Sequence, residues 1–550
     1  MKKIVSRLLN GLAKYGWPIT MAILAAFALG FTWSSSDKLY SNIRLFDRIA
    51  LMVSENYVEE IDEEKMIKVG IDAMLSKLDN YTKFLRDADY VRLRQETESQ
   101  FEGIGVSMEF HRDTLTIVSI LEGAPGHRMG LKSGDRVLKI DSTSTIGLDS
   151  KQVRMLMWGP SGSRIDLLIC RPEGKERLVT MTREDVEIQS IPYYSMISDN
   201  IGYIRVTRFS ENCLKDIKAA VKDLKKQGMN SLVLDLRGNP GGLLLEAIEI
   251  AGLFLPEDSK VVETRGRSST LISSYQVNGN SIFFKGDLVL IVNDQTASAA
   301  EILAGAIQDY DRGIIIGTET YGKGLVQQVL QFSDNSALKI TTSKYYLPSG
   351  RCLQKPDWST FELLATELKN PPDTFYYTDS GRPVYGGGGI MPDIYVENSR
   401  ESGYVTALKQ EACFFDFAIE YLRTRKIPPD FRVDDHVISE FRKFVADRGF
   451  AFLDEDRIAF NEFREKISFL DEETREALRI LENRLSSDET WQFENHYSEI
   501  MAILNEEIIL RSRGEKALYE KIWLKDHAEI EEAREILTDS KRYLSILASR

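Results

Sequence analysis

The middle of the chain lacks histidine. Five histidines occur in 550 residues, and none lies between residues 128 and 435. This absence counts strongly against a Ser-His-Asp triad confined to that region, and it leaves no His/Cys cluster there to hold a catalytic zinc ion. If this region carries out acyl transfer, its general base must be a lysine or a carboxylate.

Cysteine is scarce too, and basic charge is not concentrated anywhere. The four cysteines lie far apart in sequence, so no metal-ligand spacing occurs and we expect buried free thiols rather than a metal site. The net charge is −14, and residues 401–550 hold 33 acidic and 23 basic side chains. Because a phosphate-binding surface requires a basic stripe, we expect no nucleic-acid partner.

Long apolar runs are absent except near the N-terminus. There, an uncharged run from Trp17 to Trp33 follows four basic residues, Lys2, Lys3, Arg7 and Lys14. A basic leader before an apolar stretch is typical of an export signal. No clear small-x-small cleavage site is visible. The pattern favours an uncleaved signal anchor, residues 1–36, in the inner membrane with the rest of the chain in the periplasm, and it leaves cleavage of the anchor open.

The remaining chain divides by pattern into four parts. Helical spacing of apolar residues predicts a helical domain over 37–99, which serves for packing or dimerisation. Short strands with glycine turns predict a compact β module over 100–185. Alternating strands and helices over 186–400 predict an α/β core with a largely parallel sheet. Residues 401–550 are helical, acidic and without a chemical motif, which predicts a packed helical extension with a solvated face.

Ser298 follows a predicted strand and opens a predicted helix. In the segment Ser298-Ala299-Ala300-Glu301, the serine and glutamate fit a capping box. The same position also suits a nucleophile, because a serine at a helix N-terminus is exposed and lies beside free backbone N–H groups. The local pattern leaves both interpretations open.

Lys323 lies between two glycines, Gly322 and Gly324. It is either an ordinary loop lysine or a general base whose pKa is lowered by burial. If the segment is a strand, Gln327 shares a face with Lys323 and holds the lysine without restoring its charge as a carboxylate would. A solvent-facing glutamine is the equally simple alternative.

A glycine-rich stretch, Arg237-Gly238-Asn239-Pro240-Gly241-Gly242, follows another predicted strand. We call residues 237–242 the glycine loop. It lacks the Walker lysine and the GxGxxG spacing, so nucleotide binding is weakly supported. Its glycines either form a turn or present N–H groups as an oxyanion hole.

Taken together, these motifs resemble the carboxy-terminal processing proteases, or tail-specific proteases, of peptidase family S41. The matching segments are Asp235 to Gly242, Asn293 to Glu301, Glu319 to Gly324 with Gln327, and Gly386 to Asp393. The resemblance implies a crotonase/ClpP-like protease core that needs no metal, nucleotide or other cofactor. It implies that Ser298 is the nucleophile, Lys323 the general base and Gln327 the residue that orients the lysine. Gly242 or Gly241, with the N–H of Ala299, would form the oxyanion hole.

The β module over 100–185 resembles that family's PDZ domain. Phe101-Glu102-Gly103-Ile104-Gly105-Val106 matches its carboxylate-binding loop. The resemblance implies that Gly103, Ile104, Gly105 and Val106 capture the free C-terminus of a protein or peptide substrate. Two features depart from the family pattern: Ala300 stands where a small polar residue is usual before Glu301, and the helical extension lies outside the core pattern.

These observations predict an anchored serine endopeptidase that cleaves exported proteins recognised through their C-termini. The PDZ-like module either gates the protease or only tethers the substrate, and a homo-oligomer is left open. One alternative is a PDZ scaffold protein of the cell envelope with a decayed protease core, but both Ser298 and Lys323 stand in motif context. Another is a penicillin-binding type of acyltransferase, which has lysine three residues after the serine. Position 301 here is glutamate.

Overall fold

The computed structural model describes most of the chain in two compact units, which divide between Phe84 and Leu85. The described residues are 38–97, 100–111, 113–268, 272–279, 283–333, 336–355, 375–397, 402–450, 452, 463, 474, 476–480 and 489–548. The predicted signal anchor, residues 1–36, lies outside them. Within these ranges, no helix combines the length and apolar character needed to cross a membrane.

The first unit is helical, as its apolar spacing predicts. Residues 38–56 form one helix and α2 (Glu63–Leu75) forms another. Asp62 caps α2, because its carboxylate accepts a hydrogen bond from the Lys65 N–H at 2.9 Å. The helix over 38–56 leaves several large apolar side chains exposed, among them Leu39, Ile43, Phe46 and Ile49.

The PDZ-like module is a β-sheet with short helices. Its strands follow the order β3 (Val106–His111), β4 (Thr114–Ile120), β5 (Arg136–Ile140), β7 (Arg164–Cys170), β8 (Glu176–Thr182), and β6 (Thr143–Ser144) pairs with β5. Separately, β2 (Gln100–Gly103) pairs with β9 (Glu184–Glu187). The helices are α3 (Ala88–Thr97), α4 (Pro125–Arg128) and α5 (Ser150–Met157). Since β3 is at the edge of the sheet, the predicted carboxylate-binding loop leads directly into an edge strand.

The predicted α/β core, residues 186–400, contains a six-stranded sheet. Its strands follow the order β10 (Tyr193–Met196), β11 (Ile201–Arg205), β12 (Ser231–Asp235), β15 (Leu288–Val292), β16 (Ile314–Gly317), β21 (Ile394–Tyr395). Only the β10–β11 pair is antiparallel. The four central strands are almost entirely buried, which explains their continuous apolar sequences. The predicted α/β class is confirmed.

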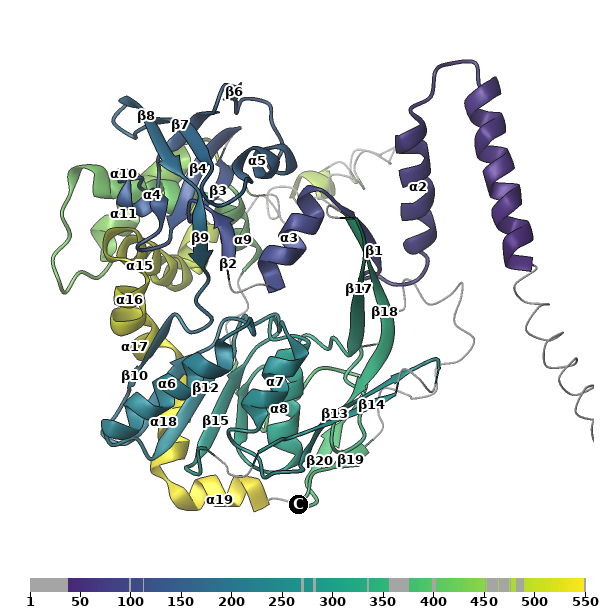
Figure 1. Ribbon diagram of the computed structural model, residues 1–550. Coiled ribbons are helices and arrows are strands. Elements are labelled where there is room, and N and C mark those ends of the chain that lie inside the picture. Colours follow the sequence, from purple (N-terminus) through teal and green to yellow (C-terminus); the bar gives the residue numbers. More distant parts are fainter. Residues whose placement is uncertain are drawn as a thin grey trace, which may run out of the picture. The chain divides into compact units, whose positions relative to one another are not determined.

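Two different parts of the chain cover this sheet (Figure 1). One face packs against α6 (Cys213–Lys226), α7 (Leu244–Ala251) and α8 (Ala299–Asp309). The other face, which includes Val233 and Ile291, packs against Ile530, Ile536 and Tyr543 of α18 (Ala528–Thr538) and α19 (Ser540–Ala548). The end of the helical extension is therefore a layer of the α/β core, and it keeps an exposed outer side with residues such as Glu531 and Glu535.

A smaller sheet lies beside this core. It contains β13 (Lys260–Gly266), β14 (Ser273–Gln276), β17 (Leu325–Ser333) and β18 (Ser336–Tyr346), all in antiparallel pairs. A short hairpin joins β19 (Phe375–Tyr377) to β20 (Pro383–Tyr385).

The rest of the helical extension has an aromatic core of its own. The core contains Phe414, Phe417 and Phe441, with ring centroids about 5 Å apart. Its helices include α9 (Gly403–Gln410), α10 (Cys413–Thr424), α11 (Asp435–Asp447), α14 (Glu489–Asn495) and α15 (Tyr497–Arg513). A π-helical turn, η2 (Tyr519–Trp523), lies between α16 (Glu515–Leu518) and α17 (Leu524–Asp526) and leads to α18.

The helical extension also holds the PDZ-like module. His111 Nδ1 lies 3.1 Å from Asp416 Oδ1, and Arg448 donates to the other oxygen of Asp416 at 2.5 Å. Arg511 donates to the Val118 carbonyl at 2.6 Å. Burial opposes the charge on Asp416, yet the hydrogen bonds from His111 and Arg448 hold its pKa below its ordinary value.

We expect Asp416→Asn to lower the free energy of unfolding by about 1–3 kcal/mol near pH 7, because a charged acceptor of two hydrogen bonds is lost. A carboxyl whose pKa is depressed by folding stabilises the protein above its unfolded-state pKa, and this contribution disappears as the pH falls through the folded-state value. The difference between wild type and variant should therefore shrink below about pH 4. Urea denaturation across pH 3–7 measures this.

The matched control is Glu494→Gln, which breaks an exposed ion pair with Arg442 in the same extension. Its effect should stay within about 0.5 kcal/mol at every pH. A difference for Asp416→Asn that stays constant from pH 7 to pH 3 would contradict the prediction.

Candidate active site

Ser298 lies at the N-terminus of α8, half-buried, where β15 and its following loop end. Its φ is 57° and its ψ is −120°, which is strained backbone for a non-glycine residue. Such a conformation costs about 1–3 kcal/mol and persists only where neighbouring contacts enforce it. Strain of this kind concentrates at functional sites, which favours the nucleophile interpretation over a plain helix cap.

Glu301 supplies the contacts that enforce this geometry. It is completely buried, and its carboxylate accepts four hydrogen bonds. Oε1 accepts from Thr320 Oγ1 at 2.6 Å and the Gly322 N–H at 2.8 Å. Oε2 accepts from the N–H groups of Ser298 at 2.7 Å and Lys323 at 2.9 Å. One oxygen therefore holds the backbones of both predicted catalytic residues, although the sequence suggests only a capping role for Glu301.

Burial is the largest influence on Glu301 and raises the pKa of its carboxyl, while the hydrogen bonds from Thr320, Gly322, Lys323 and Ser298 oppose that rise. A buried carboxylate with no positive charge beside it is unfavourable unless hydrogen-bond donors compensate for the lost water. The network thus depends on the four donors as much as they depend on Glu301.

The glycines beside Lys323 permit close packing. A Cβ atom at Gly324 would lie 2.4 Å from the Gln354 nitrogen, and one at Gly322, where φ is +86°, would lie 3.1 Å from the Gly389 nitrogen. Ile390 N–H donates to Thr320 Oγ1 at 2.6 Å. The motif from Gly386 to Asp393 therefore packs against residues 320–324, the segment that carries Lys323.

Gln327 lies within β17, whereas Lys323 lies just before that strand. A bulge between Val326 and Gln327 shifts the register against β18. The Gln327 amide lies 3.3 Å from the Leu325 carbonyl and 3.4 Å from Thr341 Oγ1. Its role beside the lysine stays a prediction.

The glycine loop packs directly against Ser298 and Ala299 at the start of α8. A Cβ atom at Gly241 would lie 2.8 Å from the Ala299 nitrogen and 3.0 Å from Ser298 Cβ. The Gly241 N–H donates to Asn239 Oδ1 at 2.8 Å. Because that donor is engaged, the N–H of Gly242 is the better candidate to act with that of Ala299, which is the first residue of α8.

The four predicted peptide-binding residues lie apart from this site in the PDZ-like module. Gly103 ends β2 and Val106 begins β3. Gly105 has φ +70°, and a Cβ there would lie 2.2 Å from Ala124 Cβ, so glycine is required. The carbonyls of Ile104 and Gly105 accept from Gly126 at 2.8 Å and Leu121 at 2.9 Å. These bonds fix the loop at the start of the edge strand.

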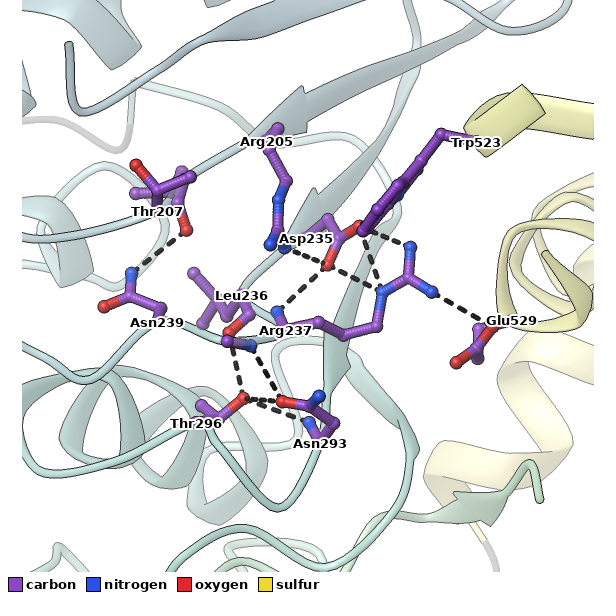
Figure 2. Close-up of polar contacts among 12 residues, drawn as sticks. Arg205, Thr207, Asp235, Leu236, Arg237, Asn239, Asn293, Thr296, Trp523 and Glu529 are labelled. Carbon is purple, nitrogen blue, oxygen red and sulfur yellow. Dashed lines mark hydrogen bonds and ion pairs between the residues drawn. The ribbon is translucent and has the colours of Figure 1, made fainter. Parts of the chain in front are cut away.

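Sequence reasoning missed a second polar network at the base of the glycine loop (Figure 2). There Asp235 and Arg237 contact Trp523, and Arg237 also contacts Glu529. Trp523 and Glu529 belong to the helical extension, and the sequence around them contains no motif that would have identified them. As for metals, no group of three or more His, Cys, Asp or Glu in the described ranges is placed to hold an ion.

Comparison with known proteins decides the family. The carboxy-terminal-processing protease of Bartonella bacilliformis is 32% identical over 339 residues, covering 60% of this chain and 77% of that protein. The carboxyl-terminal-processing protease of a Synechocystis species is 35% identical, covering 59% and 79% respectively. The chain belongs to the carboxy-terminal processing proteases of peptidase family S41.

Family models agree with this membership. The model for peptidase family S41 matches residues 200–360, a PDZ domain model matches 116–171, and the model named "Probable PDZ-protease, C-terminal helical domain" matches 404–537. Each match falls within one predicted domain, while the domain boundaries themselves stay a prediction. The photosystem II D1 C-terminal processing protease is a solved structure with 25% identity, which covers 65% of this chain and 94% of its own at a TM-score of 0.37.

The close approach in this S41 protease predicts that Gly241→Ala will inactivate it. The added methyl collides with the Ala299 nitrogen and forces the loop away from Ser298. A displacement of about 1 Å at a reacting centre costs about 100-fold in rate. We expect at least that loss in kcat, measured by peptide hydrolysis and by the rate of labelling with a fluorophosphonate.

Gly238→Ala is the matched control in the same loop. Gly238 also has a positive φ, +65°, but a Cβ there meets nothing closer than 3.5 Å. It should therefore cost stability, about 1 kcal/mol, with little loss of kcat. Equal loss of activity in both variants would show that general loop strain, not contact with Ser298, decides the effect.

Proposed function

We propose that this S41 protease is a membrane-anchored endopeptidase that cuts exported proteins by a Ser298–Lys323 dyad. The observation that carries the proposal is the shared acceptor Glu301 Oε2, which binds the N–H groups of Ser298 and Lys323 together. The strained backbone of Ser298 supports the same assignment. In a scaffold without catalysis, a strained serine and the buried carboxylate that holds it would cost stability without serving a function.

In the proposed reaction, neutral Lys323 Nζ accepts the Ser298 hydroxyl proton as Oγ attacks the substrate carbonyl. The N–H groups of Ala299 and Gly242 stabilise the oxyanion of the tetrahedral intermediate. The C–N bond then breaks, and the lysine returns its proton to the leaving amine. Water, deprotonated by the same lysine, hydrolyses the acyl-enzyme and restores Ser298. Gln327 would orient the lysine without adding charge.

The proposed setting is the cell envelope. The basic leader and the uncharged run of residues 17–33 support an anchor in the inner membrane with the catalytic part in the periplasm. The exposed apolar side chains on the helix over 38–56 are in keeping with a homo-oligomer.

For substrate selection, we propose that the PDZ domain captures free C-termini. The glycine-bearing loop before the edge strand β3 supports this, because backbone N–H groups hold the carboxylate while the peptide adds to the strand. Two modes of coupling to the protease follow. Tethering raises the local substrate concentration, whereas gating requires that bound peptide bring a withdrawn Lys323 back to Ser298.

Ser298→Ala and Lys323→Ala should each lower kcat by about 10⁴-fold or more, and the double variant should be no worse than either single variant, because the pair acts as one unit. Lys323→Arg should be equally inactive, since a guanidinium does not release its proton. The assay is cleavage of an unfolded protein with a free apolar C-terminus. Lys215→Ala, an exposed change on α6, is the control; near-normal turnover by any dyad variant would refute the assignment.

Amidation of the substrate C-terminus should lower kcat/KM by about tenfold or more, because charge-assisted hydrogen bonds to the carboxylate contribute about 1.5–3 kcal/mol. Matched free and amidated peptides measure this. Equal rates would show that the PDZ domain does not select by the carboxylate.

The same peptides separate the two modes of coupling. An uncleavable peptide with a free carboxylate, added in trans, should stimulate hydrolysis of a short reporter if capture gates the dyad. Inhibition or no effect would leave tethering as the sufficient mode.

A further inference from the structure

The strand that leads into the glycine loop ends in a saturated carboxylate. Asp235, the last residue of β12, is completely buried. Its oxygens accept from the Tyr203 hydroxyl at 2.7 Å, Arg205 Nη1 at 2.8 Å and Arg237 Nη2 at 2.7 Å. Burial opposes its charge, but the two arginines hold the pKa of Asp235 well below its ordinary value. Asp235 is therefore a fixed negative charge.

Arg237 extends from this carboxylate to the helical extension. Its side chain points away from Asn293 and Thr296 and toward Glu529, as Figure 2 shows. Arg237 Nη1 lies 3.1 Å from Glu529 Oε2. The same nitrogen lies 3.1 Å from His527 Nδ1.

Trp523 closes the network from the same side. Its ring centroid lies 5.1 Å from the Arg237 guanidinium and 5.4 Å from that of Arg205. Its indole Nε1 lies 3.4 Å from Asp235 Oδ2. The aromatic ring thus excludes water from both guanidinium groups while it contacts their shared carboxylate.

The charges show why Glu529 is needed. Arg205 and Arg237 carry two positive charges, and Asp235 supplies one negative charge. Glu529, only 3% exposed, brings the second. An uncompensated buried charge is strongly unfavourable, so removal of Glu529 would push Arg237 toward solvent or water into the network.

Any such shift would pass directly into the glycine loop, because Arg237 is its first residue. The Gly238 N–H donates to Asn293 Oδ1 at 2.8 Å. The Ala297 N–H donates to the Asn239 carbonyl at 2.9 Å. The loop is therefore anchored at its base by the helical extension and at its tip by the segment that carries Ser298.

We propose that Glu529, assisted by Trp523, is a positioning residue of the protease: through Arg237 it fixes the glycine loop, and with it the oxyanion donor at Gly242. The helical extension is thereby part of the catalytic apparatus without touching the substrate. This inference rests on the proposed function of the glycine loop, and its test includes a measurement that does not depend on that function.

The test compares Glu529→Gln with Glu531→Gln in the full chain. Glu531 lies on the same helix, but it is exposed and pairs with Arg534. Glu529→Gln should lower kcat about tenfold or more, with KM changed less than twofold, because only stabilisation of the transition state is lost. Glu529→Asp, which keeps the charge, should recover part of the rate. Glu531→Gln should match the wild type.

Hydrogen exchange supplies the independent measurement. Amides of residues 236–243 should exchange faster in Glu529→Gln than in Glu531→Gln, at a temperature where circular dichroism shows both variants folded. If Glu529→Gln does not fold, Trp523→Phe replaces it, since this change keeps an aromatic ring but removes the indole donor and part of the ring surface over the two arginines. A smaller loss of kcat and faster exchange in the same segment are expected.

Normal kcat and normal loop exchange in folded Glu529→Gln would overturn the proposal, as would a change in KM alone. Faster exchange with unchanged kcat would also overturn it, because the loop would then move without consequence. A fully active Ser298→Ala variant would instead overturn the proposed function, so the two failures are distinguishable.

Discussion

One buried carboxylate, that of Glu301, joins the parts of the candidate active site. Its two oxygens accept from Ser298, Thr320, Gly322 and Lys323, which come from two segments about twenty residues apart. A charged acceptor gives stronger hydrogen bonds than a neutral one, and burial removes water as a competitor. The strained backbone of Ser298 and the path of the lysine segment are thus consequences of one side chain, and the Ile390 segment joins the same network through Thr320.

A second constraint comes from the sheet, which needs cover on both faces. Residues 213–309 cover one face with α6, α7 and α8, and residues 528–548 cover the other with α18 and α19. The same stretch of the helical extension supplies Glu529 to the base of the glycine loop, while its earlier helices contact the PDZ domain through Asp416 and Arg511. The helical extension therefore contacts both the peptide-binding domain and the protease core.

The sequence predicts the parts of this arrangement that depend on local pattern. Continuous apolar runs identify the central strands, and motif context brings Ser298, Lys323 and the glycine loop to one edge of the sheet. Other features depend on contacts between distant residues. The bulge before Gln327 is invisible in the spacing, and the use of the Gly241 donor by Asn239 becomes visible only in the folded loop. The apolar stripe of α18 has the same period whether it faces a sheet or another helix, so its place in the core could not be read from the sequence.

The sheet's second layer also constrains the order in which activity arises. Synthesis proceeds from the N-terminus, so the motifs at Ser298 and Lys323 emerge long before residues 528–548. Until those last helices arrive, the face of the sheet around Val233, Val289 and Ile291 has no cover, and Arg237 lacks its second counter-charge. A nascent chain that already carries Ser298 and Lys323 therefore still lacks one layer of the core that holds them. Translation itself thus acts as a delay between the appearance of the catalytic motifs and the completion of the fold that holds them.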